Sequence, residues 1–175
     1  MMSRCKVYIA RKLPPPLEEM LMTVCDVESN KEDVLEKRLV YFQKIKGADA
    51  LITDSRVLVN EEVFEAAGPQ LKVVSNYAVG YNNIDVAAAT RRGIAVTNTP
   101  GVVDNATADI AWALMLSIAR RVVESDRMIR TKETWEWTPS FMQGQDISGK
   151  TLGIIGAGRI GSTMAKRARG FDMKI

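Results

Sequence analysis

The glycines of GAGRIG, residues 156–161, are the residues whose spacing most directly indicates a chemistry. The pattern G-x-G-x-x-G suits a turn that leads from a strand into a helix and binds the phosphates of a dinucleotide. Gly156 permits the tight turn, Gly158 lets the backbone approach a pyrophosphate, and Gly161 lets the helix pack close to the strand. The sequence therefore predicts a dinucleotide site. The alternative is a glycine-rich turn that holds no ligand.

The residues around this turn supply the expected context. A strand is expected at residues 151–155, a helix at 162–169 and the start of a further strand at 173–175. Arg159 is placed to add a charged donor over phosphate oxygens. Basic residues outnumber acidic ones around the turn, which fits a small anion better than a DNA backbone. The residue that would distinguish NAD from NADP is expected about 20 residues further on, past Ile175, so both cofactors stay open.

Other chemistries find little support in the composition. Histidine is absent from the 175 residues, which removes the commonest general acid/base and metal ligand, so no metal site and no catalytic side chain is predicted. Cys5 and Cys25 show no metal or redox spacing and are expected to be buried, reduced thiols of a cytoplasmic protein. The net charge of +3 is too small to indicate nucleic acid, and no apolar run reaches the roughly 18 residues of a membrane span.

The first hundred residues must position whatever site the chain carries, and they alternate strand and helix patterns. Near-continuous apolar strands between helices predict an α/β fold with a parallel sheet covered on both faces, of the flavodoxin-like type. Strands are expected at residues 6–10, 24–28, 50–53, 71–76 and 94–98, and helices at 17–22, 31–45, from 61 onward and at 85–92.

Two of these helices carry more specific expectations. In the helix at residues 31–45 an apolar stripe of Leu35, Leu39, Phe42 and Ile45 should face the core. The helix that starts after Asn60 should be capped by that side chain.

A long helix at residues 105–128 interrupts the strand–helix rhythm after Pro100. Its first half, residues 106–119, is apolar almost all round, and such a helix is expected to be buried on most sides. We therefore predict two domains, residues 1–100 and 101–175, with this helix between them. The second would be the start of a Rossmann dinucleotide-binding domain.

Four blocks give the chain a family resemblance: SNYAVGYNNID (75–85), RGIAVTNTPG (92–101), ATADIAWALMLSIARR (106–121) and GKTLGIIGAGRIG (149–161). In order and spacing they resemble the D-isomer-specific 2-hydroxyacid dehydrogenases, nearest to the glyoxylate/hydroxypyruvate reductase branch, over essentially the whole chain. The resemblance implies a discontinuous substrate domain around an inserted Rossmann domain. It also implies a homodimer and NAD(P)H-dependent reduction of a small 2-oxo acid to the D-2-hydroxy acid.

The resemblance also implies roles for particular residues. Val79 and Gly80 match the loop whose backbone N–H groups bind the substrate carboxylate, and this loop leaves the carboxyl end of an expected parallel strand, where such sheets bind ligands. The alternative is a structural turn that needs Gly80. Thr107 matches a position that touches the nicotinamide end of the cofactor, although it could equally be a helix-start threonine.

Further positions follow from the same resemblance. Gly158, Arg159 and Ile160 match the phosphate-contacting turn, together with the flanking glycines already described. Trp135 and Trp137 resemble a dimer-contact loop, and buried core aromatics are the alternative.

The family's catalytic arginine, histidine and glutamate match nothing in this chain. We therefore expect the sequence to be cut inside the cofactor domain and to be inactive alone. Two alternative functions stay open. One is a nucleotide-sensing, corepressor-like binding protein of the same family, and the other is a naturally short, non-catalytic dimerising module.

Overall fold

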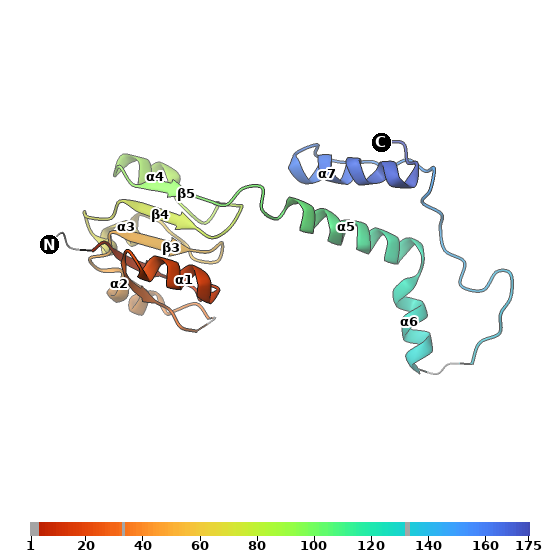
Figure 1. Cartoon of the computed structure of the whole chain (residues 1–175), viewed down its shortest axis with the longest axis horizontal. Coiled ribbons are helices and arrows are strands. Elements are labelled where there is room, and N and C mark those ends of the chain that lie inside the picture. The colour runs from red at the N-terminus through yellow and green to blue at the C-terminus, as the bar shows by residue number, and fades with distance from the viewer. Residues whose placement is uncertain (1–3, 33, 132–133) are drawn as a thin grey trace. The chain divides into compact units, whose positions relative to one another are not determined.

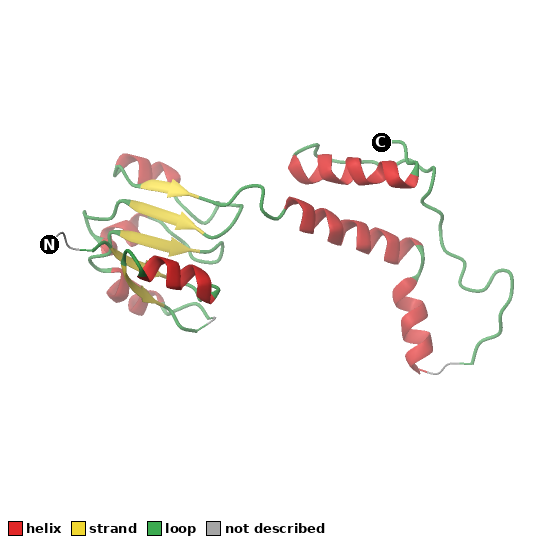
Figure 2. Ribbon diagram, in the orientation of Figure 1, coloured by secondary structure: helices red, strands yellow, loops and turns green. Residues whose placement is uncertain are grey.

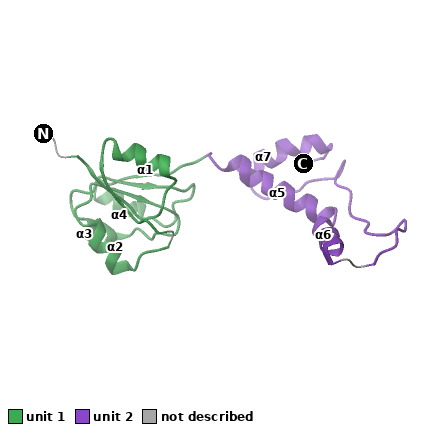
Figure 3. Ribbon diagram, turned by 60° about the horizontal axis from the view of Figure 1, so that its bottom comes forward, with its two compact units in different colours: residues 1–100 green, residues 101–175 purple. Residues whose placement is uncertain are grey.

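The computed structural model describes residues 4–32, 34–131 and 134–175; position 33, inside one of the predicted helices, lies outside these ranges. The chain divides into residues 1–100, here unit 1, and residues 101–175, here unit 2 (Figure 3). Each unit is described by itself.

Five short strands of unit 1 form one parallel sheet (Figure 2). Their order in space is β2-β1-β3-β4-β5, and the register pairs Val7 with Ala50 and Ala50 with Val73. This is the flavodoxin-like order, so the predicted α/β fold with a parallel sheet is confirmed. The strands are β1 (Lys6–Ile9), β2 (Asp26–Ser29), β3 (Ala50–Thr53), β4 (Val73–Asn76) and β5 (Ala95–Thr97).

Helices lie on both faces of this sheet (Figure 1). On the face of α1, Val7, Ile9 and Leu13 form a small core. On the face of α2, α3 and α4, a larger core includes Tyr8 and Phe64. Alternate residues of β1 thus enter different cores, as strand geometry requires of a sheet covered on both sides. The helices are α1 (Pro15–Met22), α2 (Arg38–Ile45), α3 (Glu61–Ala67) and α4 (Val86–Arg91).

The helix predicted at residues 31–45 is wrong in its first half, because α2 begins at Arg38. The side chain of Asn30 accounts for the difference. Its Oδ1 accepts the backbone N–H of Glu32 at 3.0 Å, and its Nδ2 donates to the carbonyl of Val34 at 2.9 Å. Local bonds of this kind hold the backbone in a turn and compete with a helix.

Only part of the predicted apolar stripe reaches the core. Ile45 is fully buried and Phe42 packs partly against the core, whereas Leu35 and Leu39 are 53% and 77% exposed. Leu35 precedes the helix, so it cannot share the helical face that the 3.6-residue period predicts for it.

Asn60 precedes α3 but does not cap it with its side chain, contrary to expectation. Its Oδ1 accepts a hydrogen bond from the guanidinium of Arg38 at 2.9 Å. The backbone N–H of Val63 instead bonds to the Asn60 carbonyl at 3.0 Å. A charged donor on a neighbouring helix has therefore taken the acceptor that a cap would use.

The prediction of two buried thiols is wrong for Cys5, which is exposed, while Cys25 is partly buried. Both are free cysteines that precede the edge-strand pair β1 and β2, where Lys6 lies opposite Asp26. Cys5 therefore stands at an end of the sheet rather than between its layers.

Unit 2 is built around helices. The helix predicted at residues 105–128 is wrong in its continuity, because α5 ends at Ala119 and α6 starts at Val122, with Arg121 at a φ of 54°. At the break, the carbonyl of Ala119 accepts the backbone N–H of Gln145 at 2.7 Å. The helices are α5 (Asp104–Ala119), α6 (Val122–Thr131) and α7 (Arg159–Ala168), followed by a 3₁₀ turn, η1 (Arg169–Phe171).

The expectation that α5 is buried on most sides is also wrong for this structure. Of its residues only Ala108 and Trp112 are buried, and the Trp112 ring stacks on Phe171 at a centroid distance of 4.8 Å. Leu114 is 58% and Ile118 is 78% exposed. The two strands expected in this unit make a single parallel bridge. Among the described residues of the unit, no sheet of several strands covers the remaining sides of the helix.

Trp135 and Trp137, in the segment after α6, are not core residues. Trp135 is 52% and Trp137 is 78% exposed, although Trp135 stacks on Phe141 at 5.3 Å. The interpretation of both as buried core aromatics is therefore wrong. Within the described ranges, no helix combines the length and apolar character that crossing a bilayer requires.

Candidate functional site

The loop that carries Val79 and Gly80 follows directly from β4 at the carboxyl edge of the sheet. Beneath it lies Asn76, the last residue of β4, which is fully buried. The Asn76 carboxamide accepts the Thr53 hydroxyl at 3.0 Å and donates to the carbonyl of Gly80 at 2.8 Å. Asn83, which closes the loop, lies within hydrogen-bonding distance of the same carboxamide. Thr53 at the end of β3 and Asn76 at the end of β4 thus fix the loop through one hydrogen-bond network.

The residues just after β5 also hold this loop by hydrogen bonds. The Nδ2 of Asn98 donates to the carbonyl of Val79 at 2.8 Å, and the backbone N–H of Thr99 donates to the carbonyl of Ala78 at 2.9 Å. Among the described residues, none accepts a hydrogen bond from the backbone N–H of Val79 or of Gly80. The loop therefore has occupied acceptors and available donors, an arrangement that suits an anion.

Gly80 has room for a side chain. Its φ lies outside the left-handed region, and a Cβ built on it would meet no atom within 4 Å. The turn itself therefore does not require glycine. This weakens the purely structural interpretation of Gly80, and the open space leaves its backbone accessible.

Charges also gather at the carboxyl edge of β1 and β3. Arg11 is 3% exposed and its guanidinium lies 3.3 Å from the carboxylate of Asp54. Arg56 approaches the same carboxylate at 3.2 Å. Beside the loop, a shallow pocket of about 280 Å³ is lined by Tyr81, Val86, Val96, Thr97 and Asn98.

The glycine turn of unit 2 contains two kinds of glycine. Gly156 has a φ of 97°, and a Cβ on Gly161 would lie 2.0 Å from the carbonyl oxygen of Gly156. Both therefore meet a demand of the fold, the first conformational and the second steric. Gly158 has a φ of −73° and an open space around its missing Cβ. Only Gly158 is free of a structural need, and it is the position at which a pyrophosphate would approach.

The helix after this turn begins earlier than predicted. α7 starts at Arg159 rather than at residue 162, and the N–H of Ser162 makes its first-turn bond to the carbonyl of Gly158 at 2.8 Å. Ile160 is partly exposed. The Arg159 guanidinium lies beside Gly101, where a Cβ would be 2.8 Å from Nη1.

Thr107 is exposed and is the fourth residue of α5. It does not occupy the capping position, which Val103 holds. α5 and α7 pack on each other, and the guanidinium of Arg167 pairs with the carboxylate of Asp109 at 2.6 Å. Thr107 and the glycine turn thus belong to one packed helix pair of unit 2.

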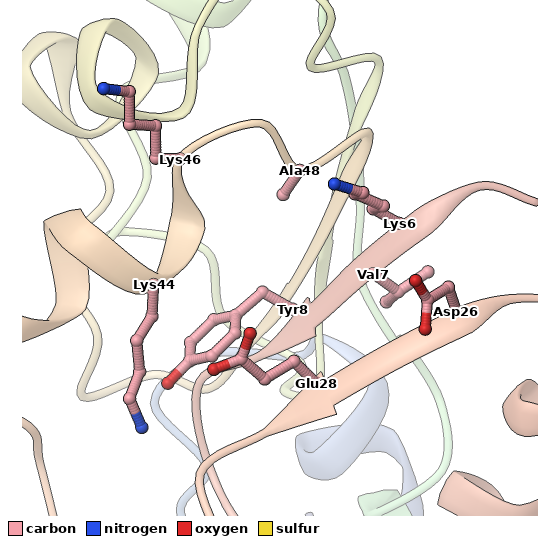
Figure 4. A pocket seen from close by; sticks show the side chains of 8 residues that line it. All are labelled: Lys6, Val7, Tyr8, Asp26, Glu28, Lys44, Lys46 and Ala48. Atoms are coloured by element: carbon pink, nitrogen blue, oxygen red, sulfur yellow. The ribbon is translucent and has the colours of Figure 1, made fainter.

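A different pocket, of about 180 Å³, lies at the edge of the sheet and is shown in Figure 4. Three lysines and two acidic residues line it, and the Tyr8 hydroxyl there donates to Glu36. Burial, together with this hydrogen bond to a carboxylate, raises the pKa of Tyr8 well above its ordinary value. The pocket contains none of the predicted site residues. No group of three or more potential metal ligands occurs in the described part of the chain.

Asn76 and Asn98 are residues that the sequence analysis missed. A signal existed, because each stands at or just after the end of a neighbouring parallel strand. Polar side chains at such ends converge on one edge of a sheet. Their partners are the backbone carbonyls of Gly80 and Val79, and the second of these lies 19 residues from Asn98 in the sequence, where no local pattern indicates it.

Comparison with known proteins places these features in a family. Residues 7–173 match the family model for the D-isomer specific 2-hydroxyacid dehydrogenase, catalytic domain. A glyoxylate reductase of Thermococcus kodakarensis is 49% identical, in a match that covers 98% of this chain and 53% of that protein. The chain thus spans about half the length of the curated relatives it matches.

Solved structures agree. A D-isomer specific 2-hydroxyacid dehydrogenase, NAD-binding, from Polaromonas is 37% identical with a TM-score of 0.87, covering 97% of this chain and 53% of that one. An acyclic imino acid reductase in complex with NADPH and D-Arg is 25% identical with a TM-score of 0.83, covering 97% and 54%. Since the family model matches nearly the whole sequence and the parallel sheet agrees with it, the chain belongs to the D-isomer-specific 2-hydroxyacid dehydrogenase family.

Proposed function

We propose that this chain supplies the substrate-binding unit and the first part of the cofactor-binding unit of an NAD(P)H-dependent reductase. Its substrate would be a small 2-oxo acid, glyoxylate or hydroxypyruvate, reduced to the D-2-hydroxy acid. The observation that carries the proposal is that glycine stands at the two predicted contact points although the fold does not require it there. Neither Gly80 in unit 1 nor Gly158 in unit 2 has a φ in the left-handed region, and both have open space where a side chain would be.

In unit 1, the loop would bind the substrate carboxylate through the backbone N–H groups of Val79 and Gly80. A carboxylate accepts hydrogen bonds only, so it matches donors that have no acceptor within the described chain. The names of relatives support the substrate class, since curated proteins that are 48–49% identical to this chain are named glyoxylate reductases.

In unit 2, the N–H groups at the start of α7 would bind the pyrophosphate of NAD or NADP. Gly158 leaves the approach open, while Gly156 and Gly161 keep the turn tight. Arg159, Ile160 and Thr107 would contact the cofactor from the same helix pair. The bound nicotinamide supplies the hydride for C2 of the oxo acid, and the residues of this chain bind and orient the reactants.

The sequence contains no histidine, so no such side chain in these 175 residues could protonate the product oxygen. The family resemblance implies a catalytic histidine as proton donor, together with an arginine and a glutamate. None of these three has a match among these residues. Exposed Trp135 and Trp137 would contribute to a homodimer contact, which their 52% and 78% exposure supports.

The proposal is tested by substituting the two free glycines in a catalytically active protein that contains this chain. Gly80→Val should raise KM for glyoxylate far more than KM for the cofactor, and Gly158→Val should weaken cofactor binding in calorimetry. Gly170→Val is a matched control, because its Cβ would also meet no atom within 4 Å. Equal effects of Gly80→Val on both reactants, or unchanged cofactor affinity in folded Gly158→Val, would contradict the assignment.

A further inference from the structure

Three consecutive carbonyl groups of the loop after β4 are each held by a donor from elsewhere in unit 1. The carbonyl of Ala78 accepts the backbone N–H of Thr99 at 2.9 Å. Those of Val79 and Gly80 accept the side-chain Nδ2 atoms of Asn98 and Asn76, each at 2.8 Å. The loop's acceptors are thus satisfied from the ends of β4 and β5.

A hydrogen bond that fixes the direction of a carbonyl group also fixes the direction of the N–H group in the same peptide unit. In a trans peptide unit the C=O of one residue and the N–H of the next lie in one plane and point in opposite directions, and the structure contains no cis peptide bond among its described residues. The Val79 carbonyl and the Gly80 N–H belong to one such unit. The hydrogen bond from Asn98 therefore fixes the direction of the Gly80 N–H, and the Thr99 N–H does the same for Val79.

Both N–H groups consequently point away from residues 98–99. In an extended strand, successive N–H groups point to opposite sides. Two successive N–H groups that point to the same side therefore need other hydrogen bonds to keep that arrangement, and here Asn98 and Thr99 provide them. Consecutive N–H groups held in this way form a concave anion site.

Asn76 braces the far end of the loop. Its carboxamide is fully buried, so its orientation is fixed by Thr53 and Asn83 rather than by solvent. Asn83 in turn donates to the carbonyls of Asp54 and Val57 at 3.0 and 2.9 Å, which ties the network to the segment after β3.

We propose that Asn98 is a positioning residue, which orients the backbone N–H donor of Gly80 by holding the Val79 carbonyl. Asn76 supports the same loop by holding the next carbonyl, that of Gly80. The inference rests on the proposed function of this loop as the carboxylate site. It assigns Asn98 a role that acts through the backbone.

The test titrates ¹⁵N-labelled chain with oxalate, a non-reacting dicarboxylate, and follows the amide resonances of Val79 and Gly80. Asn98→Ala removes the donor to Val79, and Asn82→Ala removes an exposed asparagine of the same loop as a matched control. We expect Asn98→Ala to weaken oxalate binding roughly three- to ten-fold, the range that loss of one hydrogen bond implies. Asn82→Ala should bind as the unchanged chain does. The urea midpoint of each variant shows whether stability has changed as well.

The outcomes separate the two proposals. If the amides of Val79 and Gly80 do not move in the unchanged chain, the assignment of the loop as a carboxylate site fails. If they move in the unchanged chain and equally, with the same affinity, in Asn98→Ala, only the positioning role fails.

A measurement on the unchanged chain covers the case in which Asn98→Ala does not fold. The Thr99 N–H, bonded to the Ala78 carbonyl, should exchange slowly with solvent, and those of Val79 and Gly80 should exchange fast. Protection of the Gly80 N–H comparable with that of Thr99 would overturn the proposal, because that N–H would then have an internal acceptor.

Discussion

A methyl group at residue 161 would stand 2.0 Å from the carbonyl oxygen of Gly156 and 3.2 Å from the Ile154 side chain. Because the backbone cannot yield cheaply at such a distance, Gly161→Ala should push α7 off the preceding segment. We expect a loss of about 1–3 kcal/mol in the free energy of unfolding, the usual range for overpacking. Urea unfolding measures it.

Gly158→Ala is the control for that experiment, since its added methyl group meets no atom within 4 Å. Its unfolding free energy should stay within about 0.5–1 kcal/mol of the unchanged chain, the range of ordinary glycine-to-alanine effects. Equal destabilisation by both substitutions would show that the close approach at Gly161 is not what limits the turn.

Glu18 is a second site with a testable consequence at the scale of single residues. Hydrogen bonds from Lys31 and Ser29 hold the pKa of the Glu18 carboxyl below its ordinary value of 4.5. A depressed folded-state pKa gives stability that is present above the unfolded pKa and is lost as the pH falls through the folded one. Glu18→Gln should therefore cost stability at pH 7, and the cost should shrink as urea midpoints are measured toward pH 3. A cost independent of pH would contradict this account.

At the scale of elements, the break between α5 and α6 depends on one residue in the left-handed region. Arg121 has a φ of 54°, which costs a non-glycine residue about 1–2 kcal/mol. Arg121→Gly should be more stable than Arg121→Ala by about 1 kcal/mol. Both variants lose the exposed pair with Glu124, so their difference in thermal unfolding isolates the backbone. An alanine variant as stable as the glycine variant would show that the break is not strained.

Strand–helix alternation was sufficient to predict the parallel sheet, because buried parallel strands leave continuous apolar runs. The boundaries of the helices were harder to predict from the sequence. The late start of α2 depends on the Asn30 carboxamide, whose bonds to Glu32 and Val34 outcompete a periodic pattern. The break after Ala119 contains no glycine or proline, and it coincides with a hydrogen bond from Gln145, a residue far along the chain.

At the scale of the whole molecule, some residues of the candidate site could be predicted from the sequence and others could not. Gly80 and Gly158 could be singled out from the sequence because glycine spacing and loop position are local signals. Asn76 and Asn98 could not be given a role in advance. Asn98 reaches the Val79 carbonyl only because β4 and β5 are neighbours in the sheet, and Asn76 reaches the Gly80 carbonyl only through the fold of the loop. Which glycines the fold requires also becomes visible only when the atoms around each missing Cβ are known.

The 175-residue chain alone should not turn over glyoxylate. It has no histidine for proton transfer, and the resemblance places the family's catalytic arginine outside its matched blocks. With purified chain, oxidation of NADH and NADPH by glyoxylate should stay well below about 1 per second, the low end of ordinary enzyme turnover. Turnover above that rate would require a catalytic acid among the residues present.

The loop after β4 would respond to acid in an unusual way for an anion site. Its donors are backbone amides, and the groups that aim them are carboxamides and another backbone amide. None of these gains or loses a proton between about pH 4 and pH 10. Binding of a carboxylate there would exchange no proton with the loop itself, so its affinity should stay level until the ligand itself becomes protonated. In the proposed reaction, any dependence on pH would then have to come from groups other than the donors of this loop and the side chains that hold them.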